Sequence, residues 1–406
     1  MKKVVLFNVL IALILTGCSK SADEQDVPDD GRMRIVMSLG MPKPEVNVRG
    51  LGSVGGTDGK WNGQKLRILA FRKGKISNEA ADITEIGSGG IIATTRENAA
   101  SSGLMWANDI TLYYPIQNAY DFYGYYIDDI ADNSATIIPD TEDTPGEIVV
   151  PVQIDGTQDL MVAKAELTDA QKALLDGSLT TDEEKEIEYA KAYSSYTARR
   201  GVQPNMLFKH LLSRLTFEVK AGENKILSDG LDGVYITSIE LIGVENKGNI
   251  HISAAKQELE IIPASSDNLV NLSLGIKNQI NIDGFTFDGV KPTSEVDFVP
   301  MGESIMPMPG QTAFKVKIKM RQIKDGVLIT KINDSTGAVE NEFPFETQIK
   351  APVVKDKETG DLISDTFVTG YSYRVKLTMY GLEEINITAE LAPWKQGDDI
   401  NLTPWE

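Results

Sequence analysis

The feature of this sequence that most constrains its fold is the alternation of apolar and polar residues over short segments. The clearest case is 314–321, where Phe, Val, Ile and Met occupy every second position and Lys or Arg lies between them. Successive side chains of a β-strand point to opposite faces, so this pattern predicts a strand with one buried face. The same alternation recurs at 215–220, 371–379 and 385–391. Many short alternating segments separated by turn residues predict antiparallel β-sandwiches.

The first half of the chain contains further candidate strands and one segment of different character. The strands are expected at 66–71, 110–114, 120–126 and 159–163. Residues 168–196 instead predict one or two solvated helices, because Thr168 and Thr181 each precede an acidic first turn, as helix N-caps do.

The length of 406 residues allows two domains that each bury a core. We place the boundary near 201–204. The predicted organisation is an N-terminal sandwich over 50–204, with its helical insertion near 168–196, and a C-terminal sandwich over 205–406.

An isolated alternating segment lies closer to the N-terminus. Met33, Ile35, Met37 and Leu39 share one face, and Arg32, Arg34, Val36 and Ser38 share the other. A glycine-rich stretch at 50–59 separates this segment from the next expected strand, and Arg49 immediately precedes that stretch. Such a composition predicts an exposed loop, and exposed loops are the preferred sites of proteolytic cleavage.

The first residues have the layout of a secretory signal. Lys2 and Lys3 precede an apolar run at 4–15, which is too short for a spanning helix of about 20 residues. The only cysteine, Cys18, directly follows Thr16-Gly17, and this arrangement resembles the lipobox of bacterial lipoproteins. The resemblance implies a signal peptide over 1–17 and acylation of Cys18. The alternative is an ordinary signal peptide followed by a chance cysteine.

The composition bears on partners and chemistry. The 59 acidic and 40 basic residues give a net charge of −19, which argues against nucleic acid as a partner and against electrostatic adhesion to anionic lipid. Two histidines and one cysteine leave few members for a nucleophile–His arrangement or a His-ligated metal. We expect no cofactor and no metal site, whereas a carboxylate-pair glycosidase stays open.

The order of these features resembles the fimbrillin family, the type V pilins and Mfa-like lipoproteins of the Bacteroidetes. The resemblance is carried by the lipobox, the early strand, Arg49 before a glycine-rich stretch, and the segments 113–126, 159–163 and 208–219. It implies two transthyretin-like β-sandwich domains. It also implies a structural subunit of a fimbrium, or pilus, that supports cell adhesion and is no enzyme. Such a subunit is exported as an outer-membrane lipoprotein and is displayed at the cell surface.

The resemblance also implies how the subunit assembles. An arginine-specific protease removes the N-terminal segment, and a C-terminal segment of a neighbouring subunit then adds as a strand. On this chain it places the cut between Arg49 and Gly50, so that a propeptide over 18–49 is lost with the strand Met33–Leu39. Arg32 and Arg34 are alternative cuts. The donor strand would be 400–406, with Ile400, Leu402 and Pro404 as its alternating residues.

The implied partners are fimbrial subunits of the same or another kind, the protease, and the membrane through the lipid on Cys18 before processing. Shaft, tip and uncleaved anchor roles stay open. A different class, a surface glycan-binding lipoprotein, would use exposed rings of the cluster Tyr113, Tyr114, Tyr120, Phe122, Tyr123, Tyr125 and Tyr126. We interpret these rings as core, the carboxylates Asp128, Asp129 and Asp132 as loop caps, and His210 and His251 as packed or solvated residues.

Overall fold

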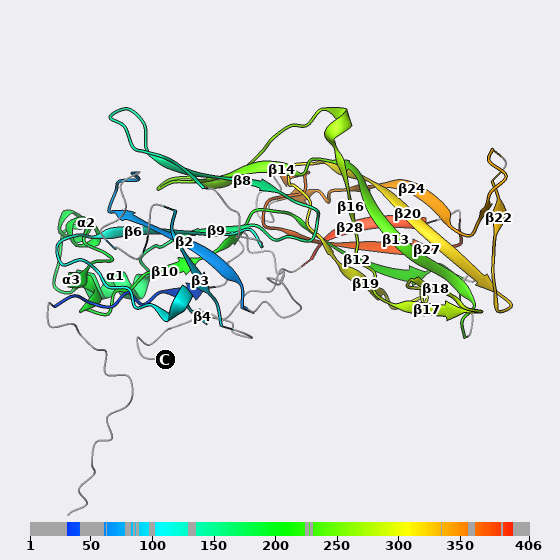
Figure 1. Ribbon diagram of the computed structural model, residues 1–406, viewed down its shortest axis with the longest axis horizontal. Helices are drawn as coiled ribbons and strands as arrows, with labels where there is room; N and C mark the ends of the chain where they lie inside the picture. The colour runs from blue at the N-terminus through cyan, green and yellow to red at the C-terminus, as the bar shows by residue number, and fades with distance from the viewer. Residues whose placement is uncertain are drawn as a thin grey trace, which may run out of the picture.

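The computed structural model describes most of the chain between residues 31 and 392. The described residues are 31–40, 61, 63–77, 83, 86, 89–96, 102–128, 135–223, 227, 230–333, 335–355, 362–382 and 385–392. Within them the protein is mainly β, with several antiparallel sheets and few helices, as the alternation predicts (Figure 1). No helix among these residues is long and apolar enough to cross a membrane.

Two sheets of the first half enclose a common apolar core. The larger has the order β11-β9-β6-β2-β3-β5, which are Lys209–His210, Met161–Lys164, Tyr120–Tyr126, Lys65–Arg72, Ile91–Thr94 and Met105–Trp106. The smaller has the order β10-β1-β4, which are Asn205–Leu207, Ser38–Gly40 and Ser102–Gly103. Ile35, Met37 and Leu39 share this core with Tyr120 and Phe122 of β6. The N-terminal segment therefore completes the core of this half.

A third sheet joins strands from the two halves of the chain. Its order is β15-β14-β8-β7, which are Gln257–Ile261, Lys247–Ile252, Glu147–Gln153 and Thr136–Ile138. β8 and β14 are antiparallel, with Val150 opposite Ile250. This sheet covers the second face of β6, where Tyr123 and Tyr125 lie in the same core as Val150 (Figure 1). The boundary near 204 stays a prediction, and strands from both sides of it share one sheet.

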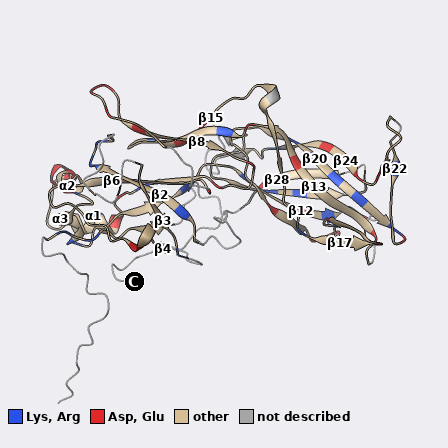
Figure 2. Cartoon of the chain, in the orientation of Figure 1, with Lys and Arg blue, Asp and Glu red and all other residues tan. Residues whose placement is uncertain are grey.

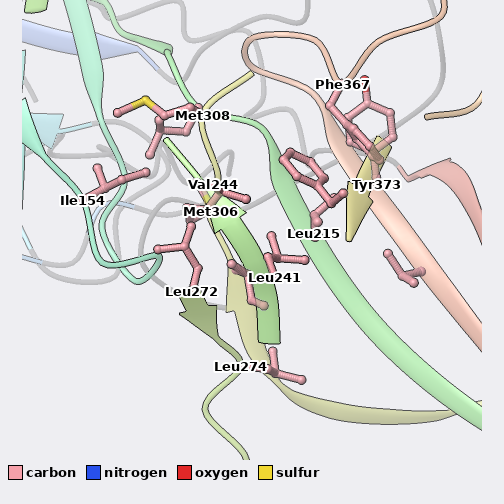
Figure 3. Packing of buried hydrophobic residues seen from close by; sticks show 14 of the residues in the cluster. Ile154, Leu215, Leu241, Val244, Leu272, Leu274, Met306, Met308, Phe367 and Tyr373 are labelled. Carbon is pink, nitrogen blue, oxygen red and sulfur yellow. The ribbon is translucent and has the colours of Figure 1, made fainter. Parts of the chain in front are cut away.

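The second half is built on two further sheets. One has the order β19-β12-β27-β28, which are Val299–Ile305, Arg214–Ala221, Ser372–Met379 and Ile385–Ala392. The other has the order β16-β13-β20-β21 with β24 also paired to β20, and these are Val270–Ser273, Gly233–Val244, Ala313–Lys324, Val327–Leu328 and Phe343–Lys350. Leu215 of β12, Leu241 of β13 and Tyr373 of β27 meet in the core between them (Figure 3).

The remaining described elements are short paired strands and 3-10 helices. The paired strands are β17 and β18 (Gln279–Ile282, Phe285–Asp288), β22 and β23 (Lys331–Ile332, Val339–Glu340), and β25 and β26 (Val354–Lys355, Leu362–Ser364). The 3-10 helices are Ala107–Asp109 and Ser266–Asn268. Among the described strands, β1 pairs with β10 and β12 with β27 in parallel, within the mainly antiparallel architecture that the sequence predicts.

The helical insertion contains one helix more than the sequence predicts. The helices are α1 Asp169–Asp176, α2 Asp182–Tyr189 and α3 Ser195–Ala198. Thr168 and Thr181 cap α1 and α2, as predicted, and each accepts a hydrogen bond from the backbone N–H three residues on. The third helix is buried rather than solvated. It lacks the acidic first turn that identified the other two, because it packs into the core.

Several charged side chains on the described surface form ion pairs. Figure 2 shows acidic residues on α2 and basic residues along β20. The basic row of β20 faces carboxylates of its neighbours: Lys319 lies 3.1 Å from Glu240 of β13, and Arg321 lies 3.3 Å from Glu342 beside β24.

Candidate functional site

The N-terminal segment Gly31–Gly40, called the inserted segment below, is buried on one face. Ile35 and Met37 are each 1% exposed and Leu39 is 0% exposed, whereas Val36 is 41% exposed. This alternation is the one that the sequence predicts, with Met33 half-buried at the start of the face. Burying three large apolar side chains stabilises the fold by about 1.5–3 kcal/mol each.

One edge of the inserted segment is hydrogen-bonded to residues 102–114. The N–H of Ile35 donates to the carbonyl of Leu112 over 2.7 Å, and the N–H of Tyr114 donates to the carbonyl of Met33 over 2.8 Å. Further on, the N–H of Leu104 donates to the carbonyl of Met37 over 3.1 Å. The expected strand at 110–114 is a single bridge at Tyr113 rather than a regular strand. The main chain of residues 110–114 instead forms hydrogen bonds with the inserted segment.

The opposite edge is held by residues 203–207. The N–H of Ser38 donates to the carbonyl of Pro204 over 3.1 Å, and Ser38–Gly40 then pair with β10. Nearer the N-terminus of the segment, the side chain of Gln203 forms the hydrogen bonds at this edge. Its Oε1 accepts from the N–H of Val36 at 3.3 Å, and its Nε2 donates to the carbonyl of Arg34 at 3.0 Å. Regular strand structure is therefore shorter than the predicted 33–39, because a side chain replaces part of the neighbouring strand.

Helix α3 lies at the N-terminal end of the inserted segment. Ser195 Oγ accepts from the N–H of Met33 at 3.3 Å and donates to the carbonyl of Tyr114 at 3.2 Å. Arg199 donates to the carbonyl of Gly31. The guanidinium of Arg32 lies 5.5 Å from the centre of the Tyr113 ring. Residues 102–114 and 203–207, which flank the inserted segment, are called the acceptor groove below.

An empty acceptor groove would be strongly unfavourable. It would expose the apolar core that Ile35, Met37 and Leu39 now cover. It would also leave the N–H of Tyr114 and the carbonyl of Leu112 without their partners. Such unpaired backbone groups form an open sheet edge, which favours the addition of another strand. The groove therefore needs an occupant of extended shape with apolar residues at alternate positions.

The other predicted processing and assembly residues lie outside the described part of the chain. These are the lipidation residue Cys18, the cleavage residues Arg49 and Gly50, and the donor-strand residues Ile400, Leu402 and Pro404. Gln203 and Ser195, by contrast, contact the inserted segment and were missed by sequence reasoning. Gln203 lies in the stretch interpreted as a domain boundary, and no sequence pattern distinguishes a glutamine that binds main chain.

Every ring of the aromatic cluster except Tyr113 is buried in the core, as its strand context predicts, and Tyr113 is half-buried beneath Arg32. Tyr114, Tyr120, Phe122 and Tyr125 are each 0% exposed. The rings of Tyr114 and Phe122 pack edge to face, 6.3 Å apart. Burial raises the pKa of the Tyr125 hydroxyl to about 12. These buried rings offer no face on which a sugar could stack, so the sequence feature behind the glycan-binding alternative does not form such a site.

The histidines and carboxylates singled out from the sequence have local partners. Buried His210 lies with Nδ1 2.7 Å from Asp159, and His251 lies between Glu147 at 3.1 Å and Glu260 at 2.8 Å. Asp128 accepts from the hydroxyl of Tyr126 at 2.7 Å, while Asp129 and Asp132 lie outside the described residues. Over the described ranges, no group of three or more His, Cys, Asp or Glu residues could hold a metal ion.

Comparison with known families settles the relationship of the chain. Residues 56–394 match the profile of the family described as fimbrillin-like, which is well over half of the sequence. The chain belongs to the fimbrillin-like family. Membership of this family supports a broad role for the chain as a fimbrial or adhesion subunit at the cell surface. The inserted segment precedes the matched region of this fimbrillin-like chain.

Solved structures similar to this fimbrillin-like chain include three proteins from Bacteroides and Porphyromonas species. A candidate cell adhesion protein from Bacteroides uniformis has 16% identity and a TM-score of 0.45, covering 90% of this chain and 99% of its own. One from Bacteroides ovatus has 14% identity and a TM-score of 0.46, with 89% and 98% covered. The tip fimbrial protein Mfa3 from Porphyromonas gingivalis has 8% identity and a TM-score of 0.33, with 89% and 100% covered. No curated protein matches the sequence.

Proposed function

We propose that this chain is a structural fimbrial subunit that is exported as a lipoprotein, cut by an arginine-specific protease and polymerised by strand exchange. The observation that carries the proposal is the position of the inserted segment. It is a strand from the N-terminus of the chain, hydrogen-bonded on both edges and buried on one face. A segment with these properties fills a groove that another extended chain can fill in its place.

Removal of the inserted segment is the step that would make the subunit competent to assemble. Arg49 and Gly50 lie after this segment and before β2, so a cut between them separates the strand from the rest of the chain. The exposed apolar groove and its unpaired backbone groups then favour the addition of a new strand. If each subunit donates to the next, the product is a head-to-tail filament.

The donor in this proposal is the C-terminal segment 400–405. It follows β28, the last described strand, and carries Ile400, Leu402 and Pro404 at alternate positions. That pattern matches the occupant that the acceptor groove needs, with apolar residues pointing to one side. The acylated Cys18 would anchor the precursor at the outer membrane until the cut releases it.

The second role within the same family is an uncleaved anchor subunit. The observation that favours it is the completeness of the inserted segment's contacts, because a filled groove has no need of a second strand. An anchor would keep both Cys18 and the inserted segment. Nothing in the geometry of the described residues favours a catalytic role, and we propose none.

The experiment that separates these roles compares the intact precursor with the Arg49→Ala variant after treatment with an arginine-specific protease. We expect the wild-type product to begin at Gly50 by N-terminal sequencing and to run as a ladder on a gel without boiling. Arg49→Ala should give neither, and Arg34→Ala is the matched control that should behave as wild type. A wild-type chain that keeps its N-terminus and stays monomeric would contradict the subunit proposal and favour the anchor.

A further inference from the structure

We propose that Gln203, which binds the main chain of the inserted segment, also binds the main chain of the C-terminal strand of a second copy when that strand replaces the segment. Its side-chain amide acts there in place of a neighbouring strand. The groove would then select an extended backbone with inward apolar residues and would be nearly indifferent to the outward side chains at the positions of Arg34 and Val36. This inference rests on the proposed strand exchange, because it concerns the occupant of the same groove.

The two contacts of Gln203 have the spacing of a β-ladder. In an extended chain the carbonyl of one residue and the N–H of the second residue after it point to the same edge. The carbonyl of Arg34 and the N–H of Val36 form such a pair, and Gln203 bonds both, at 3.0 and 3.3 Å. A primary amide carries both an acceptor and a donor, so one side chain satisfies the two groups that a neighbouring strand would satisfy.

Beyond Gln203, main-chain hydrogen bonds hold the same edge of the inserted segment. Ser38 donates its N–H to the carbonyl of Pro204, and β10 then pairs with Ser38–Gly40. Pro204 has no N–H and therefore presents only an acceptor at this point. The sequence Gln203-Pro204 followed by β10 thus provides one continuous edge for the occupant, with a side chain at its first positions.

The amide of Gln203 is held in place by other residues. The hydroxyl of Tyr114 donates to Oε1 at 3.2 Å, which fixes this atom as the acceptor end of the amide. The main-chain carbonyl of Gln203 accepts from Nε2 of Gln171, the residue at the start of α1, at 2.6 Å. Tyr114 is buried, so its hydroxyl is a fixed donor rather than a solvated one. The amide is therefore oriented before a new strand arrives.

Recognition of outward side chains is limited near Gln203. Val36 is 41% exposed and Arg34 is also exposed. Both lie on the outward face, where Gln203 contacts only their main-chain atoms among the bonds described. Ser38 makes an outward polar contact with Asn205 at 3.0 Å, further along the groove. Any extended peptide with apolar residues at the positions of Ile35, Met37 and Leu39 fits this description, including a segment from a second copy.

The first test measures hydrogen exchange at single residues in the full chain. Gln203→Leu removes both contacts, and Gln203→Glu keeps an acceptor for Val36 but loses the donor to Arg34. We expect the Val36 amide to exchange about fivefold faster in Gln203→Leu, as the loss of one net hydrogen bond implies, with a smaller change in Gln203→Glu. Gln158→Leu is the matched control, since Gln158 makes the same kind of contact with the N–H of Asp155 at 2.8 Å. An unchanged Val36 rate in Gln203→Leu would overturn the proposal.

The second test measures which peptide enters the groove after the full chain is cut at Arg49. The probes are synthetic peptides of residues 31–40, one of them with an ester in place of the Val36 amide. Wild type should favour the amide over the ester about fivefold, and Gln203→Leu should not distinguish them. A peptide with Ser at 34 and Thr at 36 should enter as well as the native one. Equal preference in both proteins would overturn the role of Gln203. Failure of every peptide to enter would instead contradict strand exchange, and the Val36 rate would still decide on Gln203.

Discussion

The N–H of Ile35 donates to the carbonyl of Leu112 over 2.7 Å, so a residue near the N-terminus is bonded directly to the middle of the first half of the chain. The Ile35 side chain is 1% exposed in the same core as Leu112. The inserted segment is thus an internal part of the fold, and its removal changes the stability of that whole half.

The first prediction concerns the buried face of the inserted segment. Met37→Ala should lower the free energy of unfolding by about 2–5 kcal/mol, because it opens a cavity in the core that β6 also lines. Val36→Ala, on the exposed face of the same segment, should change it by less than about 0.5 kcal/mol. Urea unfolding followed by fluorescence measures both. Equal effects at the two positions would contradict the inserted geometry.

The second prediction concerns the sheet shared by the two halves. Val150 of β8 and Ile250 of β14 lie directly opposite each other and in one core. Their alanine variants should show a coupling free energy of about 0.2–1 kcal/mol in a double-mutant cycle. Val150→Ala combined with Met37→Ala should be additive, because Met37 belongs to a different core. No coupling between Val150 and Ile250 would contradict the shared sheet.

The third prediction concerns alkaline pH. Burial raises the pKa of Tyr125 and of Tyr373 to about 12, and raises the pKa of Tyr114 well above its usual value of 10. The folded chain therefore holds tyrosine protons that the unfolded chain releases near pH 10. This contribution to stability should be full below pH 10 and should fall as the pH rises from 10 towards 12.

Tyrosinate absorbance tests this pH dependence. At pH 11 the folded protein should show fewer ionised tyrosines than the 13 in the sequence. Unfolding in urea at the same pH should ionise the remaining tyrosines. Tyr125→Phe should remove one of the late-titrating groups. Full ionisation of the folded protein near pH 10 would mean that the aromatic cluster is exposed, which would restore the glycan-binding alternative.

The fourth prediction concerns the proposed donor strand. Deletion of residues 400–406 should abolish the ladder of the processed subunit, because no segment would then fill the neighbour's groove. The precursor should still unfold at the same urea concentration, since its own inserted segment fills its own groove. Circular dichroism and an unboiled gel report the two properties separately. Ladders that persist after the deletion would place the donor elsewhere in the chain.

The alternation of the sequence predicted strands well where one face of the strand meets a core. The expected strand at 120–126 coincides with β6, and that at 314–321 lies within β20. The expected strand at 110–114 was wrong, because its backbone bonds the inserted segment without forming a regular ladder. Alternation reports which residues are buried, and it carries no information about which strand is the partner.

The pairing of strands far apart in the chain could not be predicted, because alternation does not identify the partner of a strand. The parallel pairing of β12 with β27 and the pairing of β8 with β14 join segments far apart in the chain. The contacts of Gln203 with Arg34 and Val36 also join distant segments, which only the folded chain brings together. They come from an ordinary glutamine beside a proline, so no local pattern could have identified them.

The most direct measurement of strand exchange is a cross-link between the acceptor groove and the donor of another copy. Gly103 of β4 faces Ser38 of the inserted segment, and a Cβ added there meets no atom within 4 Å. The side chain of Ser38 lies on the outward face, so its donor equivalent is one of the residues between the apolar positions, Asn401 or Thr403. Cleavage at Arg49 removes Cys18, the only native cysteine, so chains carrying Gly103→Cys or Thr403→Cys can be mixed without a competing thiol. The mixed, processed chains should form an intermolecular disulfide that Arg49→Ala chains carrying Cys18→Ser do not form. Processed chains that polymerise without this cross-link, when a cysteine at 401 also fails, would contradict the account.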